Sequence, residues 1–253
     1  MTDEAPSAGL MSHEDFGLTF ATPKPAATRN ILLYGPGGSG KTVNTVGTAP
    51  GPVLYLNAEG SGAIDYTRRH YPAQDIRELT ISKANAKATL AGVMRYLRAG
   101  ADGARTVVVD SVPEVFKALL KESAGTNKVD FTHYSEAGPA LEDFLRFLRD
   151  EPFHVVLIAH EATERNETTG EMVWRPYTGT NKPTLANSLV YAADIVGYCG
   201  VVGGATEDDP PRYVGQLVPA KGRTCKDRSG RLGAVRTLDI GEWIATSLSS
   251  AED

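Results

Sequence analysis

The chain has 253 residues and a formal net charge of −5 at pH 7, from 26 basic and 31 acidic side chains. Hydrophobic residues make up 41% and charged residues 23%, which is ordinary for a globular protein. No apolar run approaches the ~18 residues of a membrane span, and the acidic balance argues against a protein that coats nucleic acid through bulk charge. We therefore expect one soluble domain with no membrane partner.

Residues 1–28 have the composition of a flexible arm, with three prolines among Ala, Ser and Thr. Three apolar side chains at every second position interrupt this composition: Phe16, Leu18 and Phe20. Two interpretations stay open for them. They form a short strand laid on the body or on a neighbouring subunit, or they belong to a tail docked locally on its own chain.

The cellular compartment is predicted from the first residues and the cysteines. Residues 1–8 contain neither a basic nor an apolar leader region, which predicts that the protein is cytoplasmic. Cys199 and Cys225 lack the spacing of metal ligands, and in a reducing compartment they are expected to be free thiols.

The strongest motif is residues 35–42, which satisfy G-x-x-x-x-G-K-[ST] in full. An apolar run precedes the motif and a helix-compatible segment follows it, in the order that a phosphate-binding loop requires. Glycines let the backbone turn tightly and aim its N–H groups at phosphate. We expect Lys41 to reach the β- and γ-phosphates of ATP and Thr42 to bind Mg²⁺. The predicted nucleotide-binding residues are Gly35, Pro36, Gly37, Gly38, Ser39, Gly40, Lys41, Thr42 and Val43.

A second motif is the run of residues 106–109, which is too hydrophobic for an exposed strand and is followed by Asp110. Together with the phosphate-binding loop, this pattern is typical of a Walker B strand. Asp110 is then expected to hold the Mg²⁺ ion with Thr42, through water. Ser111 and Glu114 have the spacing of a capping box, which predicts that Ser111 caps the next helix.

Two further predicted strands end in ionisable side chains. Residues 53–56 precede Asn57-Ala58-Glu59, and residues 153–159 precede His160 and Glu161. Ligands bind beyond the carboxyl ends of strands in doubly wound sheets, so Glu59 is a candidate catalytic residue. For His160 two interpretations stay open, a sensor of the γ-phosphate and a purely structural histidine.

The other elements are predicted from periodicity and turn residues. The predicted strands are residues 76–81, 195–202, 213–218 and 234–240, and the predicted helices are residues 83–99, 141–148 and 185–193. Residues 123–137 and 162–182 have the composition of long loops, which are usually functional or mobile. A basic ribbon near the C-terminus usually indicates a solvated face; it contains Lys221, Arg223, Lys226, Arg228 and Arg231.

The order of these motifs resembles the RecA core. In that family a catalytic glutamate follows the second core strand in a (D/N)-A-E context, as Glu59 does, and the Walker B strand reads V-V-D-S-V, as residues 108–112 do. Lys221-Gly222-Arg223 resembles the pair that RecA-like and KaiC-like subunits insert into a neighbour's ATP site. His160 stands where RecA has an amide that senses the γ-phosphate.

The resemblance implies a RecA-like P-loop NTPase of the α/β class. Its mostly parallel central sheet would carry helices on both faces and a C-terminal antiparallel β extension. The expected organisation is an N-terminal arm over residues 1–28, an ATPase core over residues 29–243 and a C-terminal tail over residues 244–253.

The chain has no counterpart of RecA's N-terminal polymerisation helix or C-terminal domain, and it is most similar to the phage family of RecA-like single-strand annealing ATPases. This resemblance implies a DNA-stimulated ATPase of homologous recombination in the host cytoplasm. Its partners would be ATP, Mg²⁺, single-stranded DNA, other copies in a ring or filament and, as a further candidate, a single-stranded DNA-binding protein. Glu59 would orient the attacking water, and Lys221 and Arg223 would complete a neighbour's site. The expected DNA contacts are Arg165, Trp174, Arg175, Tyr177 and Lys182.

Two other functions stay open. A nucleotide switch, such as a loader or a KaiC-like module, would bind ATP and a protein partner with little turnover, and the Lys221 and Arg223 pair suits it equally well. A small-molecule kinase would need an acceptor pocket and usually an arginine-rich lid, which no segment clearly supplies. A glutamate that activates water would also waste ATP in a kinase.

Overall fold

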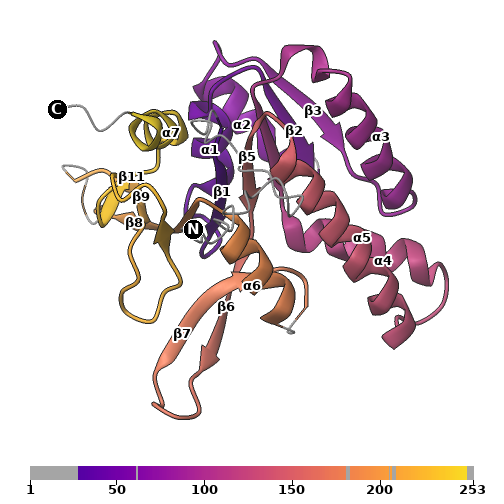
Figure 1. The fold of residues 1–253 in the computed structure, drawn as a ribbon. Helices are drawn as coiled ribbons and strands as arrows, with labels where there is room; N and C mark the ends of the chain where they lie inside the picture. The colour runs from indigo at the N-terminus through magenta and orange to yellow at the C-terminus, as the bar shows by residue number, and fades with distance from the viewer. Residues whose placement is uncertain (1–27, 61, 181–182, 205, 207–208, 250–253) are drawn as a thin grey trace, which may run out of the picture.

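The computed structural model describes residues 28–60, 62–180, 183–204, 206 and 209–249 (Figure 1). Within these residues a nine-stranded sheet has the order β11-β9-β8-β1-β5-β4-β2-β3, with β10 beside β8. The parallel strands are β1 (Asn30–Tyr34), β2 (Val53–Asn57), β3 (Ile76–Thr80), β4 (Thr106–Asp110), β5 (His154–Ile158) and β8 (Ile195–Val202). The antiparallel extension contains β9 (Arg212–Gln216), β10 (Lys226–Asp227) and β11 (Val235–Thr237). The predicted α/β class and sheet type are confirmed.

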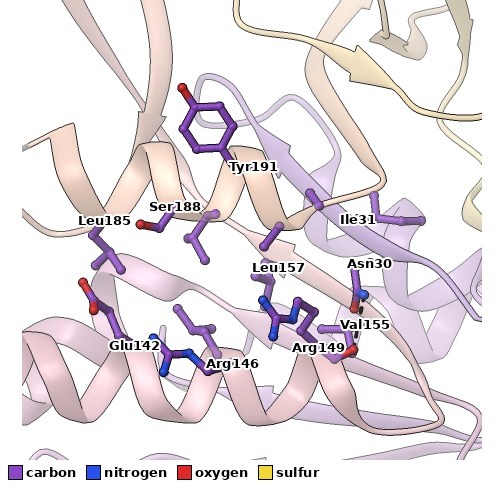
Figure 2. Close-up of a pocket in the computed structure, with 14 residues that line it drawn as sticks. Asn30, Ile31, Glu142, Arg146, Arg149, Val155, Leu157, Leu185, Ser188 and Tyr191 are labelled. Atoms are coloured by element: carbon purple, nitrogen blue, oxygen red, sulfur yellow. Dashed lines mark hydrogen bonds between the residues drawn. The ribbon is translucent and has the colours of Figure 1, made fainter. Parts of the chain in front are cut away.

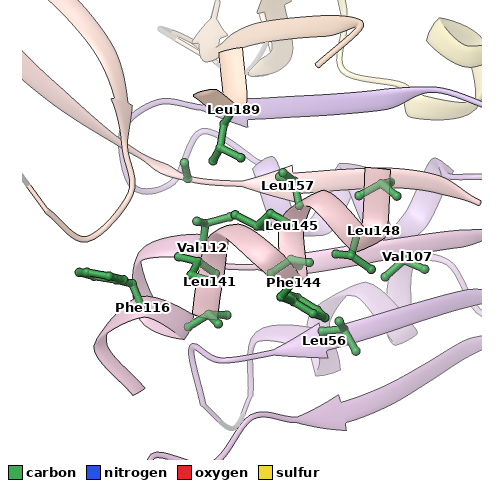
Figure 3. Close-up of a cluster of buried hydrophobic side chains, with 14 of the residues drawn as sticks. Leu56, Val107, Val112, Phe116, Leu141, Phe144, Leu145, Leu148, Leu157 and Leu189 are labelled. Atoms are coloured by element: carbon green, nitrogen blue, oxygen red, sulfur yellow. The ribbon is translucent and has the colours of Figure 1, made fainter. Parts of the chain in front are cut away.

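Helices cover both faces of this sheet. One face carries α3 (Ala86–Arg98), α4 (Val112–Ala124), α5 (Phe131–Asp150) and α6 (Pro183–Ala192), and a short 3₁₀ turn, η2 (Ala101–Gly103), precedes β4. The other face carries α1 (Lys41–Thr48), α2 (Ala63–His70) and α7 (Ile240–Leu248). Successive side chains of a strand point to opposite faces, so the strands divide their residues between two cores. Val107 packs with Phe144 in the first core (Figure 3), and its neighbour Val108 belongs to the second.

The register of the sheet brings the carboxyl ends of its central strands to one edge. Asn57 of β2 lies beside Asp110 of β4, and Asp110 lies beside Ile158 of β5. β5 also pairs with β1, which leads into the phosphate-binding loop. The loops after all four strands therefore meet, although they are far apart in sequence.

The structure corrects the predicted loop at residues 123–137. α4 extends to Ala124, and α5 already begins at Phe131, so the aromatic residues of this segment lie in the first turn of a helix. The Asp130 side chain accepts hydrogen bonds from the backbone N–H groups of Thr132 and His133, and His133 Nδ1 accepts one from the Asp130 N–H. This is a capping box with histidine in the place usually held by Glu or Gln.

The predicted loop at residues 162–182 is also corrected, because most of it is a β-hairpin. β6 (His160–Arg165) and β7 (Met172–Tyr177) pair antiparallel and extend away from the body (Figure 1). Asn166 closes the turn, since its Oδ1 accepts hydrogen bonds from the N–H groups of Thr168 and Thr169. Neither strand is buried along its length, so the sequence lacks the alternation that marks a half-buried strand.

Of the two predicted chain ends, the structure describes most of the C-terminal one but only residue 28 of the N-terminal one. α7 crosses the boundary predicted at residue 243 and belongs to the second core as far as Leu248, with Trp243 fully buried, so the predicted tail from residue 244 is wrong up to that point. Of the predicted arm, residues 1–27 lie outside the described residues. None of the helices in the described part of the chain has the length and apolar character needed to cross a membrane.

Candidate active site

A cavity of about 700 Å³ lies over the phosphate-binding loop at the carboxyl edge of the sheet. It is lined by residues 35–43, Glu59, Asp110, Ile158, His160, Glu161 and Tyr213. The structure thus places all predicted nucleotide-binding and metal-binding residues in one cavity with Glu59 and His160.

Two glycines show why the loop needs its sequence. Gly35 has φ +147°, and a Cβ there would lie 2.4 Å from the backbone oxygen of Cys199. Gly38 has φ +75°, and a Cβ there would meet no atom within 4 Å. The first glycine is needed for packing against β8, whereas the second is needed for backbone conformation and leaves its side of the loop open. An open, glycine-rich loop at the start of α1 fits a phosphate group.

Lys41 is held inside the loop by neutral acceptors. Its Nζ donates hydrogen bonds to the backbone oxygens of Gly35 (2.9 Å) and Pro36 (2.7 Å) and to Ser39 Oγ (3.1 Å). Burial lowers the pKa of Lys41, because the charged ammonium loses hydration. Phosphate oxygens are stronger acceptors for this ammonium than carbonyl groups, so the lysine is positioned to exchange these bonds for a bound polyphosphate.

Asp110 is buried, with 2% of its surface exposed. Its Oδ2 accepts hydrogen bonds from Thr42 Oγ1 (2.6 Å) and Tyr55 Oη (2.9 Å). Burial raises the pKa of Asp110, and both hydrogen bonds oppose that shift. The predicted metal residues are therefore in direct contact. A hydroxyl and a carboxylate are oxygen ligands of the kind that Mg²⁺ takes in nucleotide sites, where phosphates and water complete its coordination.

Asn57 shapes the segment that carries Glu59. The Asn57 side chain is almost fully buried, and its Oδ1 accepts hydrogen bonds from the backbone N–H groups of Glu59 (3.0 Å) and Gly60 (3.1 Å). Its Nδ2 donates to the Gly60 backbone oxygen and to Glu78 Oε1, both at 2.8 Å. Asn57 thus fixes the turn after β2 and directs Glu59 into the cavity.

The Glu59 carboxylate is held through one of its two oxygens. Ser111 Oγ donates a hydrogen bond to Glu59 Oε1, and His160 Nε2 lies 3.2 Å from the same atom. The hydrogen bond with His160, followed by that with Ser111, holds the pKa of Glu59 below its ordinary value although burial acts in the opposite direction. Ser111 occupies the N-cap position of α4, but its side chain makes no capping hydrogen bond, so the predicted capping role of this side chain is corrected to a contact with Glu59.

Sequence reasoning missed two aromatic residues at the site. Tyr213 of β9 lines the cavity, and its ring is so close to Gly40 that a Cβ there would lie 2.5 Å from it. Tyr55 bonds Asp110 from within β2. Neither residue belongs to a motif, because each reaches the site through sheet pairing.

Lys221 and Arg223 do not line the cavity of their own chain. Lys221 is exposed, with φ +53°. The Arg223 guanidinium lies 4.0 Å from the ring centroid of Tyr198, and its Nη1 donates to Gln216 Oε1. The Tyr198 hydroxyl in turn donates to Glu161 Oε2 at 3.0 Å, so a chain of contacts connects Arg223 to the cavity.

The rest of the basic ribbon is largely used within the fold, which corrects its interpretation as a solvated face. Lys226 Nζ donates to the backbone oxygens of Val190, Tyr191 and Ala193 at the end of α6. Arg228 pairs with Asp194 at 3.0 Å. Basic groups are favourable at a helix C-terminus because they satisfy its carbonyl groups.

Four of the expected DNA-contacting residues, Arg165, Trp174, Arg175 and Tyr177, lie on the hairpin, and none of them lines the cavity. Trp174 is partly buried against the first core, so it attaches the hairpin to the body. Arg175 pairs with Glu164 at 2.8 Å, and Arg165 Nε donates to the Gly170 backbone oxygen. Tyr177 is half-buried at the end of β7, and Lys182 lies outside the described residues.

Comparison with known families agrees with this geometry. Residues 27–229 match the family model of the AAA domain. The matched span contains the whole cavity and the segment from Lys221 to Arg223. It supports an AAA-type P-loop ATPase domain, with nucleotide binding and hydrolysis, and does not extend to the phage annealing family. No curated protein matches the chain.

Proposed function

The chain belongs to the AAA domain family, and we propose that it binds ATP with Mg²⁺ in the cavity over its phosphate-binding loop and hydrolyses it to ADP and phosphate. The observation that carries this proposal is the convergence of Lys41, the bonded pair of Thr42 and Asp110, and an oriented Glu59 on one cavity. Phosphoryl transfer requires that the phosphates and the attacking water are positioned and that the developing charge is stabilised, and these residues can do both.

Binding begins with the loop and the helix behind it. The backbone N–H groups of the loop and the N-terminus of α1 bind phosphate oxygens, and no acidic residue in the first turn of α1 offsets the helix dipole. Lys41 then binds the β- and γ-phosphates. Thr42 and Asp110 are the residues that would hold Mg²⁺, which neutralises phosphate charge when it is bound.

Glu59 is assigned the orientation of the attacking water. Its Oε1 is bonded to Ser111 and His160, whereas no described residue forms a hydrogen bond with its Oε2. Oε2 therefore accepts a proton from water, while the other oxygen fixes the carboxylate plane. His160, in contact with the base and lining the cavity, is assigned the sensor role.

The substitution Glu59→Gln tests this assignment, because it keeps the size of the side chain but removes its negative charge. ATP binding should persist, while turnover should fall by about 100-fold or more. Binding is measured by titration and turnover by phosphate release. If the variant hydrolyses ATP normally, Glu59 is not the base, and Glu161 on the same cavity wall is then the residue to replace.

We further propose that ATP hydrolysis is coupled to the binding of single-stranded DNA by the β6–β7 hairpin, in annealing or recombination. Two observations support it: the hairpin starts at His160, beside the nucleotide site, and it extends away from the body (Figure 1). Arg165, Arg175, Tyr177 and Lys182 are the candidate contacts, with Trp174 anchoring them.

The charge of the hairpin sets a condition on this coupling. Four acidic residues of the segment oppose a phosphate backbone: Glu161, Glu164, Glu167 and Glu171. Binding should therefore be weak without nucleotide and should weaken further with added salt. Fluorescence anisotropy with a labelled oligonucleotide, with and without a non-hydrolysable ATP analogue, measures both effects.

Phosphate release with and without single-stranded DNA separates the alternatives. Stimulation by DNA supports the coupling. Slow turnover that does not respond to DNA supports a nucleotide switch, and ADP formation only with a small acceptor supports a kinase. The last two outcomes would each reject the DNA part of the proposal.

A further inference from the structure

A second cavity lies between α5 and α6, outside the nucleotide site (Figure 2). Its volume is about 430 Å³, within the range of roughly 300–1,000 Å³ that is typical of ligand pockets. The inner wall is apolar and combines residues of both helices with those of β5: Leu145, Val155, Leu157, Leu185 and Leu189. We call this cavity the α5–α6 groove.

Charged and aromatic side chains surround the opening of the groove. Arg146 and Arg149 lie on it from α5 and Tyr191 from α6, and Tyr191 is 76% exposed. Arg149 pairs with Asp150 at 2.7 Å, whereas no described residue forms a hydrogen bond or ion pair with Arg146. Glu142 of α5 lines the groove as well, and Arg146 lies near enough to Asp150 to help lower the pKa of that carboxyl. The groove therefore offers an apolar wall with two arginines and one glutamate on its α5 side.

We propose that residues 14–20 of the same chain occupy the α5–α6 groove. This segment reads Glu14-Asp15-Phe16-Gly17-Leu18-Thr19-Phe20. In an extended conformation its three large apolar side chains point to one side, where they would contact the apolar wall. Its two adjacent acids complement Arg146 and Arg149, which sets the direction of the segment along α5.

The position of the arm makes this docking possible within one molecule. β1 starts at Asn30, which itself lines the groove. Residues 21–29 connect Phe20 to Asn30, and an extended connection of this length spans roughly 30 Å. The groove follows α5 from Glu142 to Arg149, which is about 10 Å at 1.5 Å per residue. The segment can therefore reach either end, at the high effective concentration that a short tether provides.

Cross-linking tests the occupant directly. The double variant Leu18→Cys with Ser188→Cys places one thiol on the segment and one on the groove, while the native Cys199 and Cys225 are buried. After mild oxidation we expect a disulfide within single chains, seen as a faster band on a non-reducing gel and confirmed by peptide mapping. The matched control, Leu18→Cys with the exposed Lys83→Cys, should give no such band.

Two results would overturn the proposal. A covalent dimer as the main product would mean that the segment of a second copy occupies the groove. No cross-link at all, in a protein with the circular dichroism spectrum and melting temperature of the wild type, would mean that another ligand fits there.

A charge reversal provides an independent test. Arg146→Glu should lower the yield of the cross-link at least fivefold, because it faces the acids of the segment. Adding Glu14→Lys and Asp15→Lys should restore most of the yield. The same yield in all three backgrounds would contradict the docking, since the two charged groups would then not meet.

Discussion

Glu59 and His160 form a contact whose removal has a defined pH dependence. The hydrogen bond with His160 is the largest cause of the lowered pKa of Glu59. The carboxylate must be ionised to orient water, so activity is lost as the pH falls through this pKa. In His160→Ala the pKa of Glu59 should rise, and the acid limb of the kcat profile should move to higher pH.

The matched control is His160→Gln, because an amide N–H still donates to Glu59 Oε1. Its acid limb should lie closer to that of the wild type. The profiles are measured as phosphate release at saturating ATP, over the range in which circular dichroism shows folded protein. Identical acid limbs in all three proteins would show that His160 does not control the ionisation of Glu59.

Lys41 is the residue whose replacement should weaken ATP binding most. Its three hydrogen bonds within the loop can all be exchanged for phosphate oxygens, which are charged acceptors. Lys41→Ala should therefore weaken ATP binding by about 100-fold or more, measured by titration with a fluorescent ATP analogue. Equal affinities of the wild type and the variant would contradict the site assignment. Lys83→Ala, which removes a charge from an exposed position outside the cavity, is the control.

The site residues that could be predicted from the sequence are those that belong to a motif of a few consecutive residues. The phosphate-binding loop and Asp110 are found at the expected places because loop, strand end and helix start are encoded within a few residues. The contacts of Ser111 and Tyr213 were not predicted. Both depend on which strands become neighbours in the sheet, and no local pattern specifies that order.

At the scale of elements, the long apolar and amphipathic segments were predicted well. The sequence pattern failed where an element is stabilised by polar groups. The start of α5 depends on Asp130 and His133, and the β6–β7 hairpin depends on its turn and on backbone pairing. Such elements bury too little apolar surface to leave a period of 2 or 3.6 in the sequence.

Trp174 connects the hairpin to two other parts of the fold. Its side chain packs on the first core, its backbone N–H donates to the Gly222 oxygen (2.8 Å), and its backbone oxygen accepts from Tyr34 Oη (3.1 Å). Trp174→Ala should lower the free energy of unfolding by about 2 kcal/mol, less than for a fully buried aromatic residue. Chemical denaturation measures this loss.

The matched variant Trp174→Phe retains most of the apolar contact and should recover at least half of the lost stability. If Trp174→Ala is as stable as the wild type yet loses DNA binding, the side chain acts on a ligand rather than on the fold. A loss of stability with unchanged DNA binding would confine Trp174 to its anchoring role.

On the scale of the whole molecule, the hairpin, the segment from Lys221 to Arg223 and the nucleotide site form a connected unit. Gly222 fits against β7 so closely that a Cβ there would lie 2.1 Å from the Met172 oxygen. The hairpin starts at His160, which contacts Glu59, and Arg223 contacts Tyr198, whose hydroxyl bonds Glu161. Two chains of contacts therefore connect the nucleotide site to the segment from Lys221 to Arg223, one through His160 and the hairpin and one through Glu161 and Tyr198.

This arrangement supports the proposal that copies of the chain assemble with Lys221 and Arg223 completing the ATP site of a neighbour. Neither residue lines its own cavity, although both carry the charge that a transition state of phosphoryl transfer needs. Specific ATPase activity should then rise with protein concentration.

A mixing experiment tests the assignment. Arg223→Ala and Lys41→Ala subunits, each inactive alone, should recover about a quarter of the wild-type activity in an equal mixture. The reason is that one interface in four then joins an intact loop to an intact arginine. Arg212→Ala, a change at an exposed arginine of β9, is the control and should stay active alone. If co-assembly is proven by light scattering and no activity returns, Arg223 acts within its own chain, through Tyr198 and Glu161.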